Sequence, residues 1–347
     1  MNHLLIISIL LLVFALPIDA EEKKQGEYLG AIASESPDWF KESFLEFEED
    51  VAEAAAGGRR VMLYFHQPGC PYCAKLMQEN FTDEETVTFA KKHFDGISIN
   101  MWGDREVISV GGLPFSEKTF AAALKVQYTP TLVFLDEQGK VALRLNGYYP
   151  VDQFRAALSY VAEKGEKKGS FSEYLLALQT EVNGKLITED FFQQESRLDQ
   201  LLGRGGRPLA VFFESKNCES CRIMHHKILT DPPTRKLVSA TNSVQLDVHS
   251  DQIVTTPDGR KIAVSDWASE LGVDYTPSVV FYDIQGEEVM RISAFLKTFH
   301  FQSVFAYVLE KAYLQQPSFQ RYISARGEKI REAGFDTDIW GYDSAHE

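Results

Sequence analysis

Four cysteines, arranged as two Cys-x-x-Cys pairs, are the residues of this chain best suited to chemistry. Cys70 and Cys73 form the first pair, and Cys218 and Cys221 form the second. Each pair follows an apolar run and precedes a sequence that predicts a helix, so its first cysteine is expected at a helix N-terminus. There the unpaired N–H groups and the helix dipole stabilise a thiolate. The second cysteine is placed to attack a mixed disulfide and release the product, so this spacing predicts thiol–disulfide exchange.

Structural and metal-binding roles are the alternatives for these cysteines. A buried structural disulfide, or a chance pair of core cysteines, is disfavoured because the placement occurs twice. A zinc site made of all four would have to join pairs that lie 148 positions apart. The second predicted helix offers another soft-metal candidate in Cys218, Cys221, His225 and His226, because Cys221 and His225 would share a helix face. Surface histidines are commoner than ligands, so we expect no metal and no cofactor.

The two cysteine pairs lie in two copies of one unit. Val61–Phe65, before the first pair, matches Leu209–Phe213 at an offset of 148. Further along, Tyr128-Thr129-Pro130 matches Tyr275-Thr276-Pro277 at an offset of 147. A register kept over about a hundred residues indicates a tandem duplication.

Each unit is expected to fold as helix, strand, helix, strand, helix, strand, strand, helix. The first helix is predicted over Phe44–Ala56 in one copy and Phe191–Leu202 in the other, each ended by a glycine pair. The apolar strand before each cysteine pair does not alternate with polar residues, so it should be covered on both faces. Strands of the first copy, with counterparts in the second, are predicted at Val61–Phe65, Ile97–Asn100, Leu132–Leu135 and Val141–Leu145. Insertions with turn sequences occupy about 101–118 and 249–266.

The length of 347 residues suits two domains with additional segments. Residues 1–20 are expected to be a cleaved secretory signal, because the apolar run Leu4–Leu16 is too short to span a bilayer and Ala20 is a small residue at the predicted cut. An uncleaved anchor or a core helix is the alternative. The lysine- and glycine-rich segment Lys164–Gly169 marks the predicted boundary between the two units. The expected domains are 21–168 and 169–316, followed by a charged helix and an aromatic-bearing tail over 317–347.

Charge excludes two classes of partner. The net charge is −15, from 35 basic and 50 acidic residues, and this field repels phosphate backbones and anionic lipid surfaces. We therefore expect no nucleic-acid binding. Because no other apolar run is long enough to span a bilayer, we also expect no membrane insertion of the mature chain. Four cysteines are also too few for a small secreted scaffold held by disulfides, so apolar packing must build the core.

With these motifs, both copies resemble the thioredoxin fold over nearly their whole length, a mixed sheet flanked by helices. In that family a Cys-x-x-Cys at a helix start faces a cis-proline before a central strand. Thr129-Pro130 and Thr276-Pro277 stand at that position. The resemblance implies that both bonds are cis, that these residues and Pro71-Tyr72 contact substrate, and that the backbone beside each proline pairs with a substrate peptide. It also implies that Cys70, Cys73, Cys218 and Cys221 are catalytic.

Within the family, the chain looks most similar to exported thioredoxin-like proteins of the SoxW type. The resemblance rests on Phe65–Gly69, on the insertion before the proline and on Phe134-Leu135-Asp136 after it. It implies a protein thiol–disulfide oxidoreductase of the bacterial periplasm, with protein thiols or disulfides as substrates and a membrane-embedded thiol protein as a candidate electron donor. The alternative is a non-enzymatic partner-binding or metal-binding protein of the same fold.

The buried aspartate of cytoplasmic thioredoxins has no counterpart here. Its place is taken by Tyr64 in the first unit and Phe212 in the second. His66 and Glu214, four residues before their cysteine pairs, are the possible substitutes in proton transfer. The alternative interpretation makes both of them solvated loop side chains.

Overall fold

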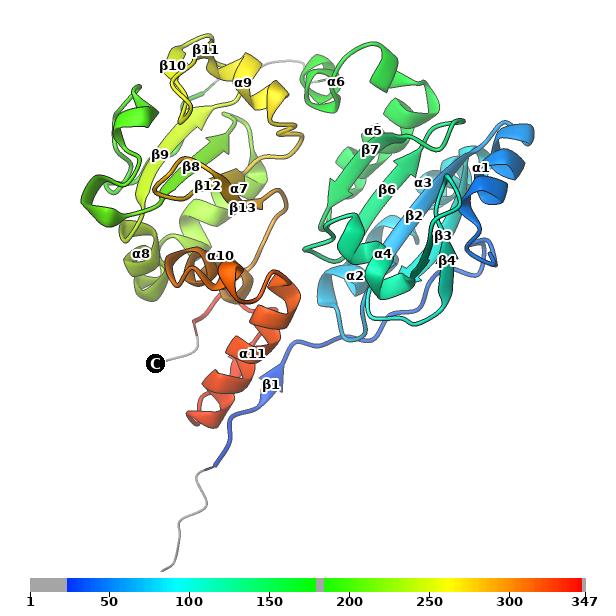
Figure 1. The fold of residues 1–347 in the computed structure, drawn as a ribbon, viewed down its shortest axis with the longest axis horizontal. Coiled ribbons are helices and arrows are strands. Elements are labelled where there is room, and N and C mark those ends of the chain that lie inside the picture. The colour runs from blue at the N-terminus through cyan, green and yellow to red at the C-terminus, as the bar shows by residue number, and fades with distance from the viewer. Residues whose placement is uncertain (1–23, 179–183, 345–347) are drawn as a thin grey trace, which may run out of the picture.

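The computed structural model describes residues 24–178 and 184–344 (Figure 1). The predicted signal segment, residues 1–20, lies outside these ranges. Within them, no helix combines the length and the apolar character that crossing a membrane requires.

The first unit contains a four-stranded mixed sheet in the order β3-β2-β6-β7. Its central strand β2 pairs in parallel with β3 and antiparallel with β6. The strands are β2 (Arg60–His66), β3 (Phe94–Asn100), β6 (Thr131–Leu135) and β7 (Val141–Asn146). The helices are α1 (Phe47–Ala56), α2 (Pro71–Lys75), which continues as one π-helical turn over Leu76–Asn80, α3 (Glu84–His93), α4 (Glu117–Ala123) and α5 (Val151–Ala162).

The second unit repeats this sheet in the order β13-β12-β8-β9. The strands are β8 (Leu209–Glu214), β9 (Asn242–Asp247), β12 (Ser278–Tyr282) and β13 (Glu288–Ile292). The helices are α7 (Glu219–Ile223) with its π-helical continuation Met224–Ile228, α8 (Pro232–Ser239), α9 (Val264–Glu270) and α10 (Thr298–Leu309). The predicted pair of tandem α/β units is therefore confirmed.

Strand β2 shows why the sequence before each cysteine pair lacks polar alternation. Met62 and Tyr64 point into one apolar cluster, whereas Val61, Leu63 and Phe65 point into another on the opposite face. Successive side chains of a strand alternate between faces, so a strand with a core on each side must be apolar throughout. Strand β8 divides its residues between two clusters in the same way.

The predicted helix over Phe191–Leu202 is wrong, whereas its counterpart in the first unit is present as α1. In the second unit only a 3₁₀ turn, Leu198–Gln200, forms. In both units an isolated β-bridge lies at the start of this segment. Glu46 pairs with Ile108 in the first unit, and Arg197 pairs with Thr255 in the second. From that bridge to the glycine pair the second unit has three residues fewer than the first, which removes almost one helical turn.

The insertions fold as hairpins rather than as turns alone. Strands β4 (Glu106–Ile108) and β5 (Pro114–Ser116) pair antiparallel, as do β10 (Ile253–Thr255) and β11 (Lys261–Ala263). Helix α6 (Phe171–Leu178) follows the predicted boundary at 168/169, but Phe171 packs in the core of the first unit beside Tyr160. The first core thus reaches past Lys168.

The two units pack together through equivalent loops. Asn146 Nδ2 donates to Ser293 Oγ at 3.0 Å, and these two residues match each other at the repeat offset of 147. Beside this contact, the Tyr128 hydroxyl donates to the carbonyl oxygen of Arg291 at 2.8 Å, and the rings of Tyr149 and Tyr275 meet at 4.8 Å. The loops that follow β7 and β13 therefore face each other.

A C-terminal segment lies across both units. Helix α11 (Phe319–Glu332) packs on α10 of the second unit, and the short strand β14 (Thr337–Asp338) pairs in parallel with β1 (Tyr28–Leu29) near the start of the described chain. Figure 1 shows α11 and β1 side by side beneath the two sheets.

Candidate active site

The first cysteine pair is a disulfide at the N-terminus of α2. The Cα atoms of Cys70 and Cys73 are 5.2 Å apart. Cys70 is the N-cap residue, and its sulfur accepts a hydrogen bond from the backbone N–H of Cys73 at 3.0 Å. The same sulfur accepts from the hydroxyl of Thr129 at 3.3 Å and lies 3.4 Å from the Thr129 carbonyl oxygen. The structure thus brings the predicted cysteines and the predicted threonine together.

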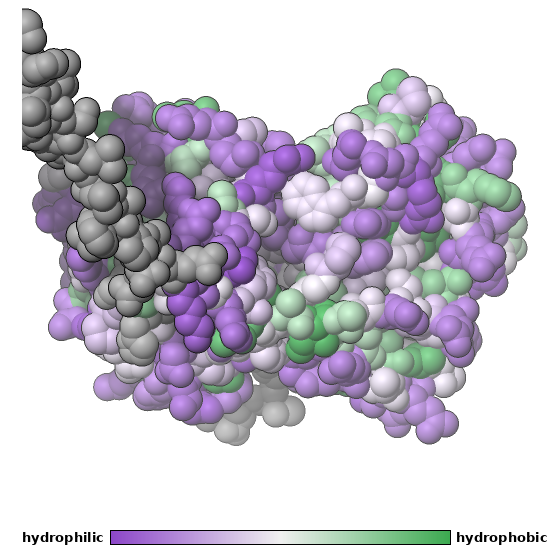
Figure 2. Space-filling model, turned by 90° about the horizontal axis from the view of Figure 1, so that it is seen from below, coloured by the Kyte–Doolittle hydropathy of each residue, from purple (hydrophilic) through white to green (hydrophobic). Residues whose placement is uncertain are grey.

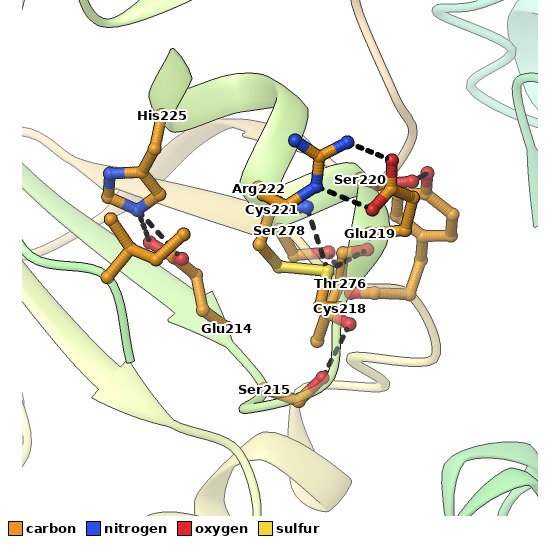
Figure 3. The surroundings of a disulfide bond; sticks show 12 residues. Glu214, Ser215, Cys218, Glu219, Ser220, Cys221, Arg222, His225, Thr276 and Ser278 are labelled. Atoms are coloured by element: carbon orange, nitrogen blue, oxygen red, sulfur yellow. Dashed lines mark hydrogen bonds and ion pairs between the residues drawn. A yellow bond between two sulfur atoms is a disulfide. The ribbon is translucent and has the colours of Figure 1, made fainter. Parts of the chain in front are cut away.

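The second pair has the same geometry at α7 (Figure 3). Cys218 caps the helix and its sulfur accepts from the N–H of Cys221 at 2.9 Å. This sulfur lies 3.3 Å from the carbonyl oxygen of Thr276, whose hydroxyl is within 3.1 Å of Ser215 Oγ. The Thr129–Pro130 and Thr276–Pro277 peptide bonds are both cis, as the resemblance implied.

This arrangement favours an anionic sulfur at the first position of each pair. A capping thiolate meets the N–H groups at the helix start, and hydrogen bonds to the charged form lower the pKa of such a group. The second cysteine is buried one turn inside the helix, so a substrate meets the first cysteine before the second. The geometry can therefore support attack by Cys70 or Cys218 and resolution by Cys73 or Cys221.

A family model described as a thioredoxin-like domain matches the chain twice, over residues 47–162 and 195–309. Together these stretches cover well over half of the sequence. The chain belongs to the thioredoxin-like family.

Solved structures of thioredoxin-fold proteins are similar to single domains of this chain. A thioredoxin-fold protein from Helicobacter pylori is 26% identical, covering 35% of this chain and 79% of its own, with a TM-score of 0.31. A thioredoxin from Thermus thermophilus is 29% identical over 34% of this chain and 85% of its own, with a TM-score of 0.29. The periplasmic thioredoxin SoxS from Paracoccus pantotrophus is 22% identical over 31% and 99%, with a TM-score of 0.22. Comparison with functionally curated proteins gives no match.

The two thioredoxin-like sites differ in exposure. All four residues of the first motif, Cys70 to Cys73, are buried, and Cys70 is only 4% exposed. In the second motif Cys218 and Ser220 are half-buried, Glu219 is exposed and Cys221 alone is buried. Cys218 also lines a groove of ≈ 990 Å³ between the domains, with Thr276, Tyr72 and Trp340 among its other walls. Figure 2, a view from below, shows the notch that separates the two halves of the molecule.

Tyr72, predicted to contact substrate, lies in the contact between the first domain and the C-terminal part of the chain. Its hydroxyl accepts the backbone N–H of Lys297 at 2.8 Å. Its ring meets the rings of Trp340 at 4.9 Å and His300 at 5.3 Å. The neighbouring Pro71 is buried too. These partners are far away in the sequence, so no local pattern indicated that the first motif would be covered.

A buried acid–histidine cluster lies beside the second disulfide (Figure 3). Glu214 and His225 are each 1% exposed. Nε2 of His225 is 3.0 Å from Glu214 Oε2, and Nδ1 is 3.0 Å from Glu189 Oε1. Burial by itself would lower the pKa of His225, but the hydrogen bonds and charges of Glu214 and Glu189 outweigh it and raise that pKa. Both ring nitrogens of His225 therefore face carboxylates, and Glu214 is no solvated loop side chain.

The described part of the first domain has no such cluster. His66 stands at the position of Glu214, and Met77 stands at that of His225 at the repeat offset of 148. His66 stacks on Tyr64 with their ring centroids 5.3 Å apart, and burial lowers its pKa. Within the described residues, no three His, Cys, Asp or Glu side chains form a group suited to hold a metal ion.

In the second motif, the exposed carboxylate of Glu219 is bound by Arg222 in two hydrogen bonds of 2.5 and 2.7 Å.

Proposed function

We propose that the protein is an exported thiol–disulfide oxidoreductase that exchanges protein disulfides or thiols, with the more exposed second cysteine pair as the site that meets protein substrates. The observation that carries this proposal is the position of Cys218. Its sulfur caps α7, lies beside the Thr276 carbonyl and lines the wide groove between the domains. A substrate peptide in that groove can approach the sulfur and the backbone of Thr276 together.

The chemistry needs no group beyond the cysteines. In the reducing direction, the Cys218 thiolate attacks one sulfur of a substrate disulfide, forms a mixed disulfide and displaces a substrate thiolate, which takes up a proton. The Cys221 thiolate then attacks the Cys218 sulfur and displaces the second substrate thiolate. The dithiol has lost two electrons and two protons, and the substrate has gained them. The reverse sequence oxidises a substrate.

The sequence supports the remaining parts of the proposal. The signal-like segment 1–20 and the likeness to SoxW-type proteins support export to the bacterial periplasm. Outside the cytoplasm the oxidised pairs need an electron source, for which a membrane-embedded thiol protein is the proposed class.

We propose Thr276 and Pro277 as substrate contacts at the second site, and Thr129, Pro130, Pro71 and Tyr72 at the first. The proposed domain limits remain 21–168, 169–316 and 317–347, with Phe171 of the second range packing back into the core of the first domain.

Reduction of insulin by dithiothreitol tests this function. The wild-type protein is expected to raise the initial rate at least about tenfold over dithiothreitol alone, because a helix-capped thiolate attacks faster than a free thiol. A variant with all four cysteines changed to serine should keep the wild-type circular dichroism and give no acceleration. Equal acceleration by this variant would show that thiol exchange is not involved. It would favour a partner-binding protein that merely presents the fold.

A further inference from the structure

The C-terminal helix α11 covers the first disulfide. Gln320 of α11 is buried, and its side chain accepts from Gln67 Nε2 at 2.9 Å and donates to the carbonyl oxygen of Gln127 at 2.9 Å. The backbone N–H of Phe319 donates to Gln127 Oε1 at 3.1 Å. Gln67 also donates to the hydroxyl of Thr129, which contacts Cys70. A chain of amide hydrogen bonds thus ties α11 to the first site.

The second domain closes another side of this site. Gly147, in the loop after β7, lies so close to Ala294 that a Cβ built on it would be 2.4 Å from the Ala294 Cβ. Leu296 and His300 of the second domain line the space in front of Cys70 together with Ile323 of α11. A substrate peptide added along the backbone beside Thr129 would overlap these groups.

A cavity of ≈ 170 Å³ remains beside Cys70. The exposed residues Ala31 and Pro68 are among its walls, so it opens to solvent on that side. The corresponding space beside Cys218 is the groove of ≈ 990 Å³. The two sites of one chain therefore admit molecules of very different size.

We propose that the first site exchanges with low-molecular-weight thiols and disulfides, and that Gln320 of α11 is the residue that excludes proteins from it. This inference rests on the proposed thiol–disulfide chemistry. The Cys70 thiolate attacks a small disulfide, a Cys70–substrate disulfide forms and one small thiolate leaves. Cys73 then attacks Cys70 and releases the second thiolate, so that two electrons and two protons pass from the dithiol to the small disulfide.

Single-site proteins test this inference. Cys218→Ser/Cys221→Ser leaves only the first pair, and Cys70→Ser/Cys73→Ser leaves only the second. Each is reduced with dithiothreitol, desalted and mixed with bis(2-hydroxyethyl) disulfide or with insulin, and the loss of protein thiols is followed. We expect the two proteins to react with the small disulfide at rates within about tenfold of each other, and the first-site protein to react with insulin at least about a hundredfold more slowly, because exchange rates follow access to the sulfur.

Gln320→Ala in the first-site protein tests the role of the helix. It should raise the rate with insulin at least about tenfold and leave the rate with the small disulfide within about twofold, because it removes both hydrogen bonds that the Gln320 side chain makes to the first domain. Lys329→Ala, an exposed change on the same helix, is the matched control and should alter neither rate.

Two results would overturn the inference. One is a first-site protein that reduces insulin as fast as the second-site protein does. The other is a first-site protein that reacts with neither disulfide while the second-site protein reacts with both. If the second-site protein itself fails with both disulfides, the proposed function fails as well, so the two failures are distinguishable.

Discussion

Cys218→Ser in the otherwise intact chain is expected to lower insulin turnover at least about a hundredfold, whereas Cys70→Ser should lower it less than about twofold. The reason is access: Cys218 lines the wide interdomain groove, and Cys70 lies beneath α11 and the second domain. Turnover is measured with dithiothreitol as the electron source. Each variant is compared with wild type at equal concentration.

The resolving role of Cys221 gives the second half of this prediction. Cys221→Ser is expected to accumulate a mixed disulfide with the substrate through Cys218, because nothing remains to displace the bound chain. Non-reducing electrophoresis and mass spectrometry of the captured peptide identify the linked cysteine. Cys218→Ser should capture no substrate. Capture by Cys218→Ser but not by Cys221→Ser would reverse the two roles, and equal loss of turnover in Cys70→Ser and Cys218→Ser would contradict the difference in access.

The sequence predicted the features that depend on neighbouring residues. The cysteine spacing, the apolar strand before it and the threonine–proline element are short patterns, and the duplication repeated each of them. Cys218 and Thr276 meet because the fold that such patterns specify brings the start of α7 to the start of β12. The helix predicted over Phe191–Leu202 does not form, because too few residues separate the bridge at Arg197 from the glycine pair.

The features that escaped prediction depend on contacts between distant parts of the chain. Tyr72 and Lys297 are 225 positions apart, and Gln67 and Gln320 are 253 positions apart. No periodicity marks such pairs, so the burial of the first motif could not be deduced from its own neighbourhood. The expectation that His225 is a surface residue is wrong, because helix periodicity gives no warning of a buried carboxylate on the adjoining strand. The two acids that face it, Glu189 and Glu214, come from outside the helix.

Glu214→Ala is expected to lower the free energy of unfolding by about 3 kcal/mol at pH 6, because it removes the carboxylate that faces a fully buried His225 and leaves that ring nitrogen unpaired. Glu219→Ala is the matched control, since this carboxylate is exposed, and its stability should stay close to that of the wild type. Urea denaturation with both disulfides intact measures the two values. A loss from Glu214→Ala as small as that from the control would contradict a stabilising role for the buried pair.

The same variant should change the pH dependence of stability. The pKa of His225 is raised in the folded protein above its ordinary value of about 6.5. The stabilisation from charged His225 is therefore complete below about pH 6.5 and declines as the pH rises through the folded-state pKa. The difference in unfolding free energy between wild type and Glu214→Ala should consequently be larger at pH 6 than at pH 9. A difference that stays constant, or grows with pH, would show that His225 is neutral in the folded protein and that Glu214 acts on it only as a hydrogen-bond acceptor.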